Sequence, residues 1–134
     1  MELFHPKSVV DVGCGIGNFL KVFKQHGVDK ILGLDGNWVD RSLLRKNIPE
    51  EYFTNIDLEK EFTSFTQSIA SKFDLAISVE VAEHLHPQYA ENFVQGLCSL
   101  SDTVIFSAAV PMQGGENHIN EQWPTYWIEH FAKN

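Results

Sequence analysis

The feature that most constrains the fold of this chain is the regular alternation of short apolar segments with segments of helical periodicity. Apolar runs rich in β-branched and aromatic residues are found at 8–12, 31–34, 52–56, 73–78 and 103–107. Between them, apolar residues recur at helical spacing in 16–23, 39–44, 62–69 and 90–97, and again after Pro124. Strands that alternate with helices in this way are typical of an α/β fold with an open parallel sheet and helices on both faces.

The composition is that of one globular domain. The chain has 134 residues with Lys+Arg 10 and Asp+Glu 18, which gives a net charge of −8, and hydrophobic residues make up 43%. Disordered chains are poorer in apolar residues. No apolar run approaches the roughly 20 residues of a membrane helix, and the N-terminus lacks a secretory signal. We therefore expect a single cytoplasmic domain over 1–134 with no membrane contact, and the acidic balance disfavours nucleic acid as a partner.

The two cysteines, Cys14 and Cys98, cannot form a disulfide framework or a four-cysteine zinc site. Cys14 lies inside a glycine-rich segment, DVGCGIG, which follows the first expected strand and precedes the first helix. Glycines there let the backbone turn sharply and approach a ligand closely, and a helix N-terminus offers free N–H groups. A dinucleotide loop would require glycine where Asn18 stands, and the Walker pattern is absent.

The segment VVDVGCGIGNFL resembles the first motif of class I S-adenosylmethionine (SAM)-dependent methyltransferases. The resemblance continues in order through ILGLDG, NIDL, FDLAISVEVAEHLHP and TVIFSAAVP, and covers about 8–111. It implies a Rossmann-like open sheet in the order 3-2-1-4-5 and SAM as the cofactor. The family usually continues into two further strands and often has a helical cap before the first strand. This chain lacks both, so we expect a minimal or truncated form of the domain.

The resemblance also implies which residues hold SAM. Asp11 either orders the glycine loop or meets the amino-acid end of SAM, Asp35 binds the ribose hydroxyls, and Asp57 lies near the adenine. Two alternatives stay open: Asp35 as a solvated turn residue and Asp57 as a helix cap. Trp38 is expected to pack under the second helix, with adenine stacking as the other possibility. The full expected set is Asp11, Gly13, Cys14, Gly15, Gly17, Asp35, Gly36, Asp57, Leu58 and Val79.

An acidic cluster with a histidine follows the fourth expected strand. If the chain turns helical at Glu80, then Glu80, Glu83 and His84 share one face. Two carboxylates and an imidazole can hold Mg²⁺ or Mn²⁺, and His118 can join from the later loop. The pattern resembles both the small-RNA 2′-O-methyltransferases, which bind a metal, and the ubiquinone-type O-methyltransferases. The alternative is that the acids stabilise a helix N-terminus and that His84 packs or faces the substrate.

The long polar segment 108–122 is expected to act as a substrate lid, with Gly114 and Gly115 as its flexible point. His118, Glu121 and Trp123 are its substrate-side candidates. Trp123, Trp127 and Phe131 recur every four residues, which favours an amphipathic last helix over a stacking wall for substrate.

Without further strands, the segment 103–107 would leave an unpaired sheet edge, which invites pairing or aggregation. We therefore expect that the last helix or a second copy of the chain covers this edge.

The sequence thus predicts methyl transfer from SAM to oxygen or nitrogen of a small molecule. His84 or His118 would be the general base, because histidine titrates near neutral pH, with Glu83 beside them. The alternatives are an RNA 2′-O-methyltransferase with a metal at the Glu-Glu-His cluster and a SAM-binding module without catalysis. Asn18 argues against a nucleotide-dependent oxidoreductase.

Overall fold

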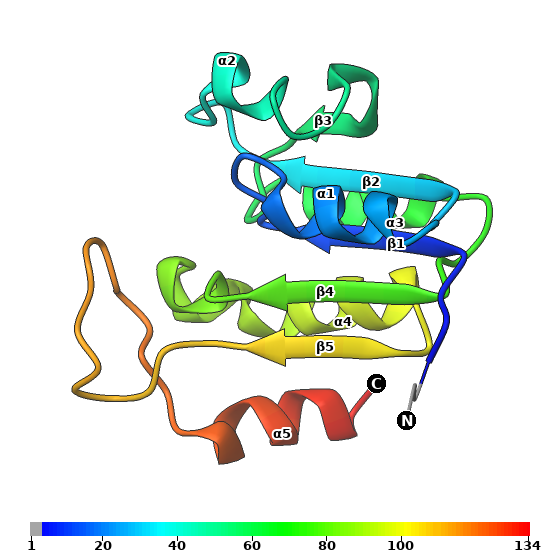
Figure 1. Ribbon diagram of the computed structural model, residues 1–134. Helices are drawn as coiled ribbons and strands as arrows, with labels where there is room; N and C mark the ends of the chain where they lie inside the picture. Colours follow the sequence, from blue (N-terminus) through cyan, green and yellow to red (C-terminus); the bar gives the residue numbers. More distant parts are fainter. Residues whose placement is uncertain (1–3) are drawn as a thin grey trace.

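The fold is built on one parallel sheet, described for residues 4–134 of a computed structural model (Figure 1). Its strands run in the order β3-β2-β1-β4-β5, as predicted. The central strand β1 pairs in parallel with β2 and β4, which places Val10 between Leu32 and Ala76. The strands are β1 (Ser8–Val12), β2 (Lys30–Asp35), β3 (Phe53–Asn55), β4 (Leu75–Val79) and β5 (Val104–Ser107).

The helices follow the predicted alternation and differ from it mainly at their ends. They are α1 (Asn18–Gln25), α2 (Arg41–Leu44), α3 (Phe62–Ser68), α4 (Ala90–Leu100) and α5 (Pro124–Ala132). Single 3-10 turns occupy Glu50–Tyr52, Ala82–His84 and Pro87–Tyr89. Pro87 therefore opens a 3-10 turn, and α4 begins three residues later, at Ala90. No helix within 4–134 has the length and apolar character that crossing a bilayer requires.

Alternate residues of each strand face opposite sides of the sheet, and each side has its own apolar core. Val9 packs with Leu20 of α1 and Leu44 of α2 on one side. Val10 packs with α3, α4 and Trp127 of α5 on the other. Figure 1 shows α1 on the opposite side of the sheet from α3 and α4. Helices therefore cover both faces, and the polar groups that could serve a ligand lie at the ends of the strands.

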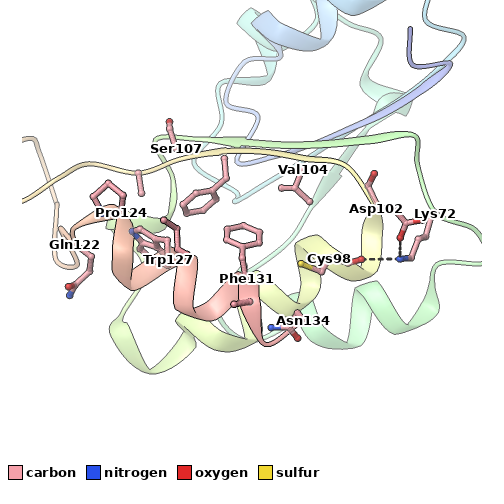
Figure 2. A pocket seen from close by; sticks show the side chains of 15 residues that line it. Lys72, Cys98, Asp102, Val104, Ser107, Gln122, Pro124, Trp127, Phe131 and Asn134 are labelled. Carbon is pink, nitrogen blue, oxygen red and sulfur yellow. Dashed lines mark hydrogen bonds and ion pairs between the residues drawn. The ribbon is translucent and has the colours of Figure 1, made fainter. Parts of the chain in front are cut away.

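The edge strand β5 is covered by the last helix. Helix α5 lies alongside it (Figure 1), and the Phe106 ring centroid is 5.2 Å from those of both Trp127 and Phe131. An apolar groove of about 980 Å³ remains between β5 and α5, with Val104 and Phe131 among its lining residues (Figure 2). The last helix thus covers this edge in part, since it packs on Phe106 and leaves Ile105 52% exposed, and pairing of two copies stays a prediction.

The two tryptophans at the start of the last helix have different environments. Trp127 is 4% exposed inside the core, whereas Trp123 precedes the helix and is 56% exposed. We expect Trp127→Ala to lower the free energy of unfolding by about 3–5 kcal/mol, because it opens a large cavity. The control Trp123→Ala should change it by no more than about 0.5 kcal/mol. Urea unfolding of both variants measures this, and equal losses would contradict the assigned packing.

Candidate active site

The candidate site lies where the carboxyl ends of the parallel strands meet. In open α/β sheets this edge holds the ligand crevice, next to the point where the strand order reverses. The reversal falls between β1 and β4, because the chain passes from β1 outward to β2 and β3 and then returns to β4. The loops after β1, β2, β4 and β5 carry most of the polar residues that the sequence singled out.

The glycine loop after β1 has backbone torsion angles that only glycine adopts easily. Gly13, Gly15 and Gly17 have φ values of +82°, +52° and +79°, a region that residues with a Cβ rarely adopt. At Gly13 a Cβ would lie 2.3 Å from Val81, so the loop packs tightly on that side. At Gly15 a Cβ would meet no atom within 4 Å. Gly15 therefore has open space beside its Cα, where a ligand can approach the backbone.

Asp35 joins the end of β2 to this loop. Its Oδ2 accepts a hydrogen bond of 2.7 Å from the Gly15 N–H, and its Oδ1 accepts one of 2.7 Å from the Gly36 N–H. The residue is only 6% exposed, so the reading as a solvated turn residue is wrong. Each carboxylate oxygen can accept more than one hydrogen bond. Asp35 can therefore hold the loop and still accept a hydrogen bond from a ligand.

Asp11 lies beside Asp35 and has no partner for one of its oxygens. It is 2% exposed, and Oδ2 accepts no hydrogen bond within the described residues. Burial, followed by repulsion from Asp35, raises the pKa of Asp11 to about 7. An unsatisfied carboxyl of this kind costs stability, and such groups concentrate at functional sites. The site is thus prepared for a cation or a hydrogen-bond donor.

The other residues expected around SAM have mixed environments. The Oδ1 of Asp57 accepts hydrogen bonds from the backbone N–H groups of Glu59 and Lys60, so this carboxylate caps the local turn. Leu58 packs in the core, and Val79 ends β4 in register with Ser107. The sulfur of Cys14 points toward β2, since a Cβ on Gly33 would lie 2.7 Å from it. Cys14 and Leu58 therefore do not present their side chains to the crevice.

The expectation that Trp38 packs under the second helix is wrong. Its side chain is 73% exposed, and a Cβ on Gly36 would lie 2.1 Å from the indole ring. The ring therefore rests on Gly36, directly after Asp35. Glycine is needed at 36 for this close approach.

The structure gathers ligand atoms of Glu83, His84 and His118 at one point, and the carboxylate of Glu80, although next to Glu83, is not among them. One ligand atom from each of the three lies within 4.8 Å of the others. Glu80 has a left-handed φ of 57°, and its carboxylate accepts hydrogen bonds from Ser107 Oγ and Gln113 Nε2. The helical turn begins at Ala82 instead. The predicted shared face therefore holds for Glu83 and His84 alone.

Glu83 is fully buried, and neither of its carboxylate oxygens has a hydrogen-bond partner within the described residues. Burial raises the pKa of Glu83 above its usual value, and repulsion from Glu80 adds to this. The Glu83 backbone carbonyl accepts hydrogen bonds of 2.9 Å from the N–H groups of Ile119 and Asn120. These bonds fix the loop after β5 above Glu83 and bring His118 to the cluster.

Both histidines form a hydrogen bond through Nδ1, and His118 turns its Nε2 toward Glu83. His84 Nδ1 lies 3.2 Å from the Asn117 carbonyl, and His118 Nδ1 lies 2.9 Å from Glu121 Oε1. Because a carbonyl and a carboxylate can only accept, the neutral rings carry their proton on Nδ1. His118 Nε2 is 4.0 Å from Glu83 Oε1. The cluster therefore offers two nitrogen lone pairs and a buried carboxyl group.

Two further buried polar residues were not singled out from the sequence. Ser78, in β4, and Asn120, beside Glu83, are 0% and 2% exposed, and each has an unpartnered polar atom within the described residues. Ser78 belongs to an otherwise apolar strand, and its hydroxyl is the one feature of the sequence that could have indicated a functional residue there. Nothing in the segment HINEQ distinguishes Asn120 from its polar neighbours.

With this geometry described, comparison with known proteins gives the class. Residues 2–127 match the family described as "Methyltransferase domain", and the chain belongs to that family. Its fold is similar to a SAM-dependent methyltransferase from Archaeoglobus fulgidus, with TM-score 0.70, 18% identity, and coverage of 94% of this chain and 59% of that one. It is also similar to magnesium protoporphyrin IX methyltransferase from Synechocystis PCC 6803, solved with bound SAM, with TM-score 0.67, 20% identity and coverage of 94% and 57%.

A curated relative matches this chain over only part of the relative's own length. The ribosomal protein L11 methyltransferase of Helicobacter pylori (strain Shi470) is 29% identical over 121 residues, which is 90% of this chain and 34% of that protein. The chain thus spans about a third of the length of that relative. The membership of the family and the Rossmann-like methyltransferase fold together confirm the class that the glycine motif indicated.

The raised pKa of Asp11 predicts a stability that depends on pH. The unfolded value is near 3.8 and the folded value about 7, so the folded state holds an extra proton between these limits. The free energy of unfolding therefore falls as pH rises from 4 to 7, by up to about 4 kcal/mol from this group. We expect Asp11→Asn to be more stable than the wild type at pH 8 and to show a flatter pH profile.

Urea unfolding between pH 5 and pH 8 measures this effect. Asp29→Asn, at an exposed turn, is the matched control and should keep the wild-type profile. If the free energy of unfolding of Asp11→Asn changes with pH in parallel with that of the wild type, then ionisation of Asp11 does not destabilise the fold, which would contradict the prediction.

Proposed function

We propose that this domain transfers a methyl group from SAM to oxygen or nitrogen of a small molecule. The observation that carries the proposal is the open space beside Gly15, next to the two buried carboxylates Asp35 and Asp11. The backbone of Gly15 borders this space, its N–H is held by Asp35, and the unpartnered Asp11 carboxyl lies next to that pair. A ligand with hydroxyl groups and a cationic group would satisfy these atoms, and SAM has a ribose, an ammonium and a sulfonium.

The residues of the crevice fit SAM part by part. Asp35 has acceptor capacity for ribose hydroxyls, and Asp11 can accept from the amino group. The exposed ring of Trp38, resting on Gly36, offers an apolar face for the adenine. SAM supplies a methyl group on a positively charged sulfur, so the protein's task is alignment and deprotonation of the acceptor.

The acceptor would lie against Glu83, His84 and His118. The Nε2 atoms of the two histidines have free lone pairs, so either can take a proton from a hydroxyl or an amine. The buried Glu83 carboxyl, 4.0 Å from His118 Nε2, would stabilise the imidazolium that forms. The loop above Glu83 would close the site on the solvent side.

Charge favours a neutral or cationic acceptor over an anionic one. The carboxyl edge of the sheet carries Asp11, Asp35, Asp57, Glu80, Glu83 and Glu121, and the chain has a net charge of −8. A phosphate backbone would be repelled there, which disfavours RNA. The Helicobacter pylori relative is named for a protein substrate, so an L11-type peptide belongs in the acceptor screen beside small alcohols, phenols and amines.

One specific observation favours a second reading, in which the cluster holds a divalent cation. Glu83, His84 and His118 offer a carboxylate and two imidazole nitrogens within 4.8 Å, and the Nδ1 bonds to Asn117 and Glu121 are of the kind that orient metal-binding histidines. Mn²⁺ suits this mixed ligand set better than Mg²⁺. A bound cation would lower the pKa of an acceptor hydroxyl, and the histidines would then bind rather than act as bases.

SAM binding is tested at Asp35. We expect Asp35→Ala to weaken SAM binding roughly ten- to hundredfold, because each lost hydrogen bond to a charged acceptor costs about 1.5–3 kcal/mol. Calorimetric titration measures the dissociation constant, and a melting curve checks that the variant is folded. Asp29→Ala, at an exposed turn, is the control. An unchanged SAM affinity in folded Asp35→Ala would remove Asp35 from the site.

A chelator separates the two readings of the cluster. If His84 or His118 is the base, methyl transfer survives EDTA. If a cation is required, EDTA abolishes transfer and Mn²⁺ or Mg²⁺ restores it. SAM binding, which depends on the other half of the crevice, should be unaffected by EDTA in both cases. Full activity in EDTA would exclude the metal reading.

A further inference from the structure

The loop between β5 and α5 is folded around a single carboxylate, that of Glu121. Its Oε2 accepts a hydrogen bond of 3.0 Å from the Met112 N–H. Its Oε1 accepts one of 2.9 Å from the Gly114 N–H and one of 2.9 Å from His118 Nδ1. One side chain thus connects two backbone groups at the tip of the loop with a histidine of the acceptor cluster.

The tip of the loop is also held by hydrogen bonds from Gln113 Nε2 to Glu80 Oε2 and between His84 Nδ1 and the Asn117 carbonyl, but the backbone N–H groups of Met112 and Gly114 depend on Glu121. Met112 and Asn117 have φ values of 72° and 60°, a region that costs energy for residues with a side chain. Met112 is 90% exposed, so apolar burial does not offset this cost. A backbone in such a conformation persists only when its surroundings enforce it, and the Glu121 carboxylate accepts two backbone hydrogen bonds there, from Met112 and Gly114.

The base of the loop is held independently of Glu121. The N–H groups of Ile119 and Asn120 bond to the Glu83 carbonyl, and the N–H of Gln122 bonds to the carbonyl of Ala109. A change at Glu121 should therefore free the N–H groups of Met112 and Gly114 and the His118 ring, while the base stays above Glu83.

The chemical consequence concerns which nitrogen of His118 carries the proton. A carboxylate cannot donate, so the neutral ring must hold its proton on Nδ1 and present a lone pair at Nε2. Nε2 is the atom that faces Glu83, 4.0 Å away. A base or a metal ligand needs that lone pair, and the opposite tautomer would present an N–H instead.

We propose that Glu121 is a positioning residue, which sets the tautomer and orientation of His118 and couples them to the conformation of the loop tip. The inference rests on the proposed function for its effect on turnover, but its structural part holds whether His118 acts as a base or as a ligand. It assigns to Glu121 a role that differs from direct contact with the substrate.

The test is ¹⁵N NMR of the histidine rings at pH 8 in the wild type, Glu121→Gln and Glu116→Gln. Glu116 is an exposed acid of the same loop and serves as the control. The wild type and the control should show His118 protonated on Nδ1. In Glu121→Gln the amide nitrogen can donate to His118 Nδ1, which the carboxylate cannot, so the share of the Nε2-protonated form should rise.

Turnover gives the second readout. In Glu121→Gln, kcat should fall about 10- to 100-fold, as for other residues that orient an active histidine, while the dissociation constant for SAM stays unchanged. If the wild type transfers no methyl group but the tautomer shifts as stated, the proposed function fails and the positioning role stands. A wild-type His118 protonated on Nε2, or an unchanged tautomer in Glu121→Gln, would overturn the proposal even if methyl transfer is observed.

Discussion

The hydrogen bond from the Gly15 N–H to the Asp35 carboxylate is the contact on which the site depends. It joins the loop after β1 to the end of β2, and it exists because parallel pairing brings these two strand ends to the same edge of the sheet. The positive φ values of the loop glycines let the backbone turn at that point. Once Asp35 is held there, Asp11 is buried beside a second carboxylate with an oxygen unsatisfied. Geometry and charge at the crevice thus follow from one pairing of neighbouring strands.

The two sides of the candidate site present different polar groups. On the side of β1 and β2, buried carboxyl groups call for a cation and for hydroxyl donors. On the side of β4 and β5, two imidazole nitrogens and the buried Glu83 call for a proton or a metal ion. In each half, some polar atoms of the described residues have no hydrogen-bond partner, which lowers the free energy of unfolding. A ligand that binds these atoms would restore that free energy. A methyl donor in the first half and an acceptor in the second would be held next to each other, as group transfer requires.

Sequence reasoning worked where one local pattern determines the structure. Alternating apolar runs gave the five strands, and the spacing of the glycines gave the loop that meets Asp35. It was wrong where the tertiary environment decides the outcome. Glu80 takes a left-handed backbone and bonds to Ser107 and Gln113, because β5 and the following loop reach it from far along the chain. Trp38 rests on Gly36 rather than under α2, and no periodicity encodes that contact. Asp57 bonds to the turn at Glu59 and Lys60 and does not cap α3, whose N-cap is Glu61, so the helix-cap alternative is wrong.

A crystal structure of the protein with S-adenosylhomocysteine, the demethylated form of SAM, tests the central claim most directly. The account predicts the ribose hydroxyls on Asp35, the amino-acid end over Gly15 and beside Asp11, and the sulfur on the side of the crevice that carries Glu83, His84 and His118. The ligand should leave the Gly15–Asp35 bond in place. A structure in which the ligand lies elsewhere, for instance in the apolar groove between β5 and α5, or in which its sulfur faces away from the histidines, would contradict the account.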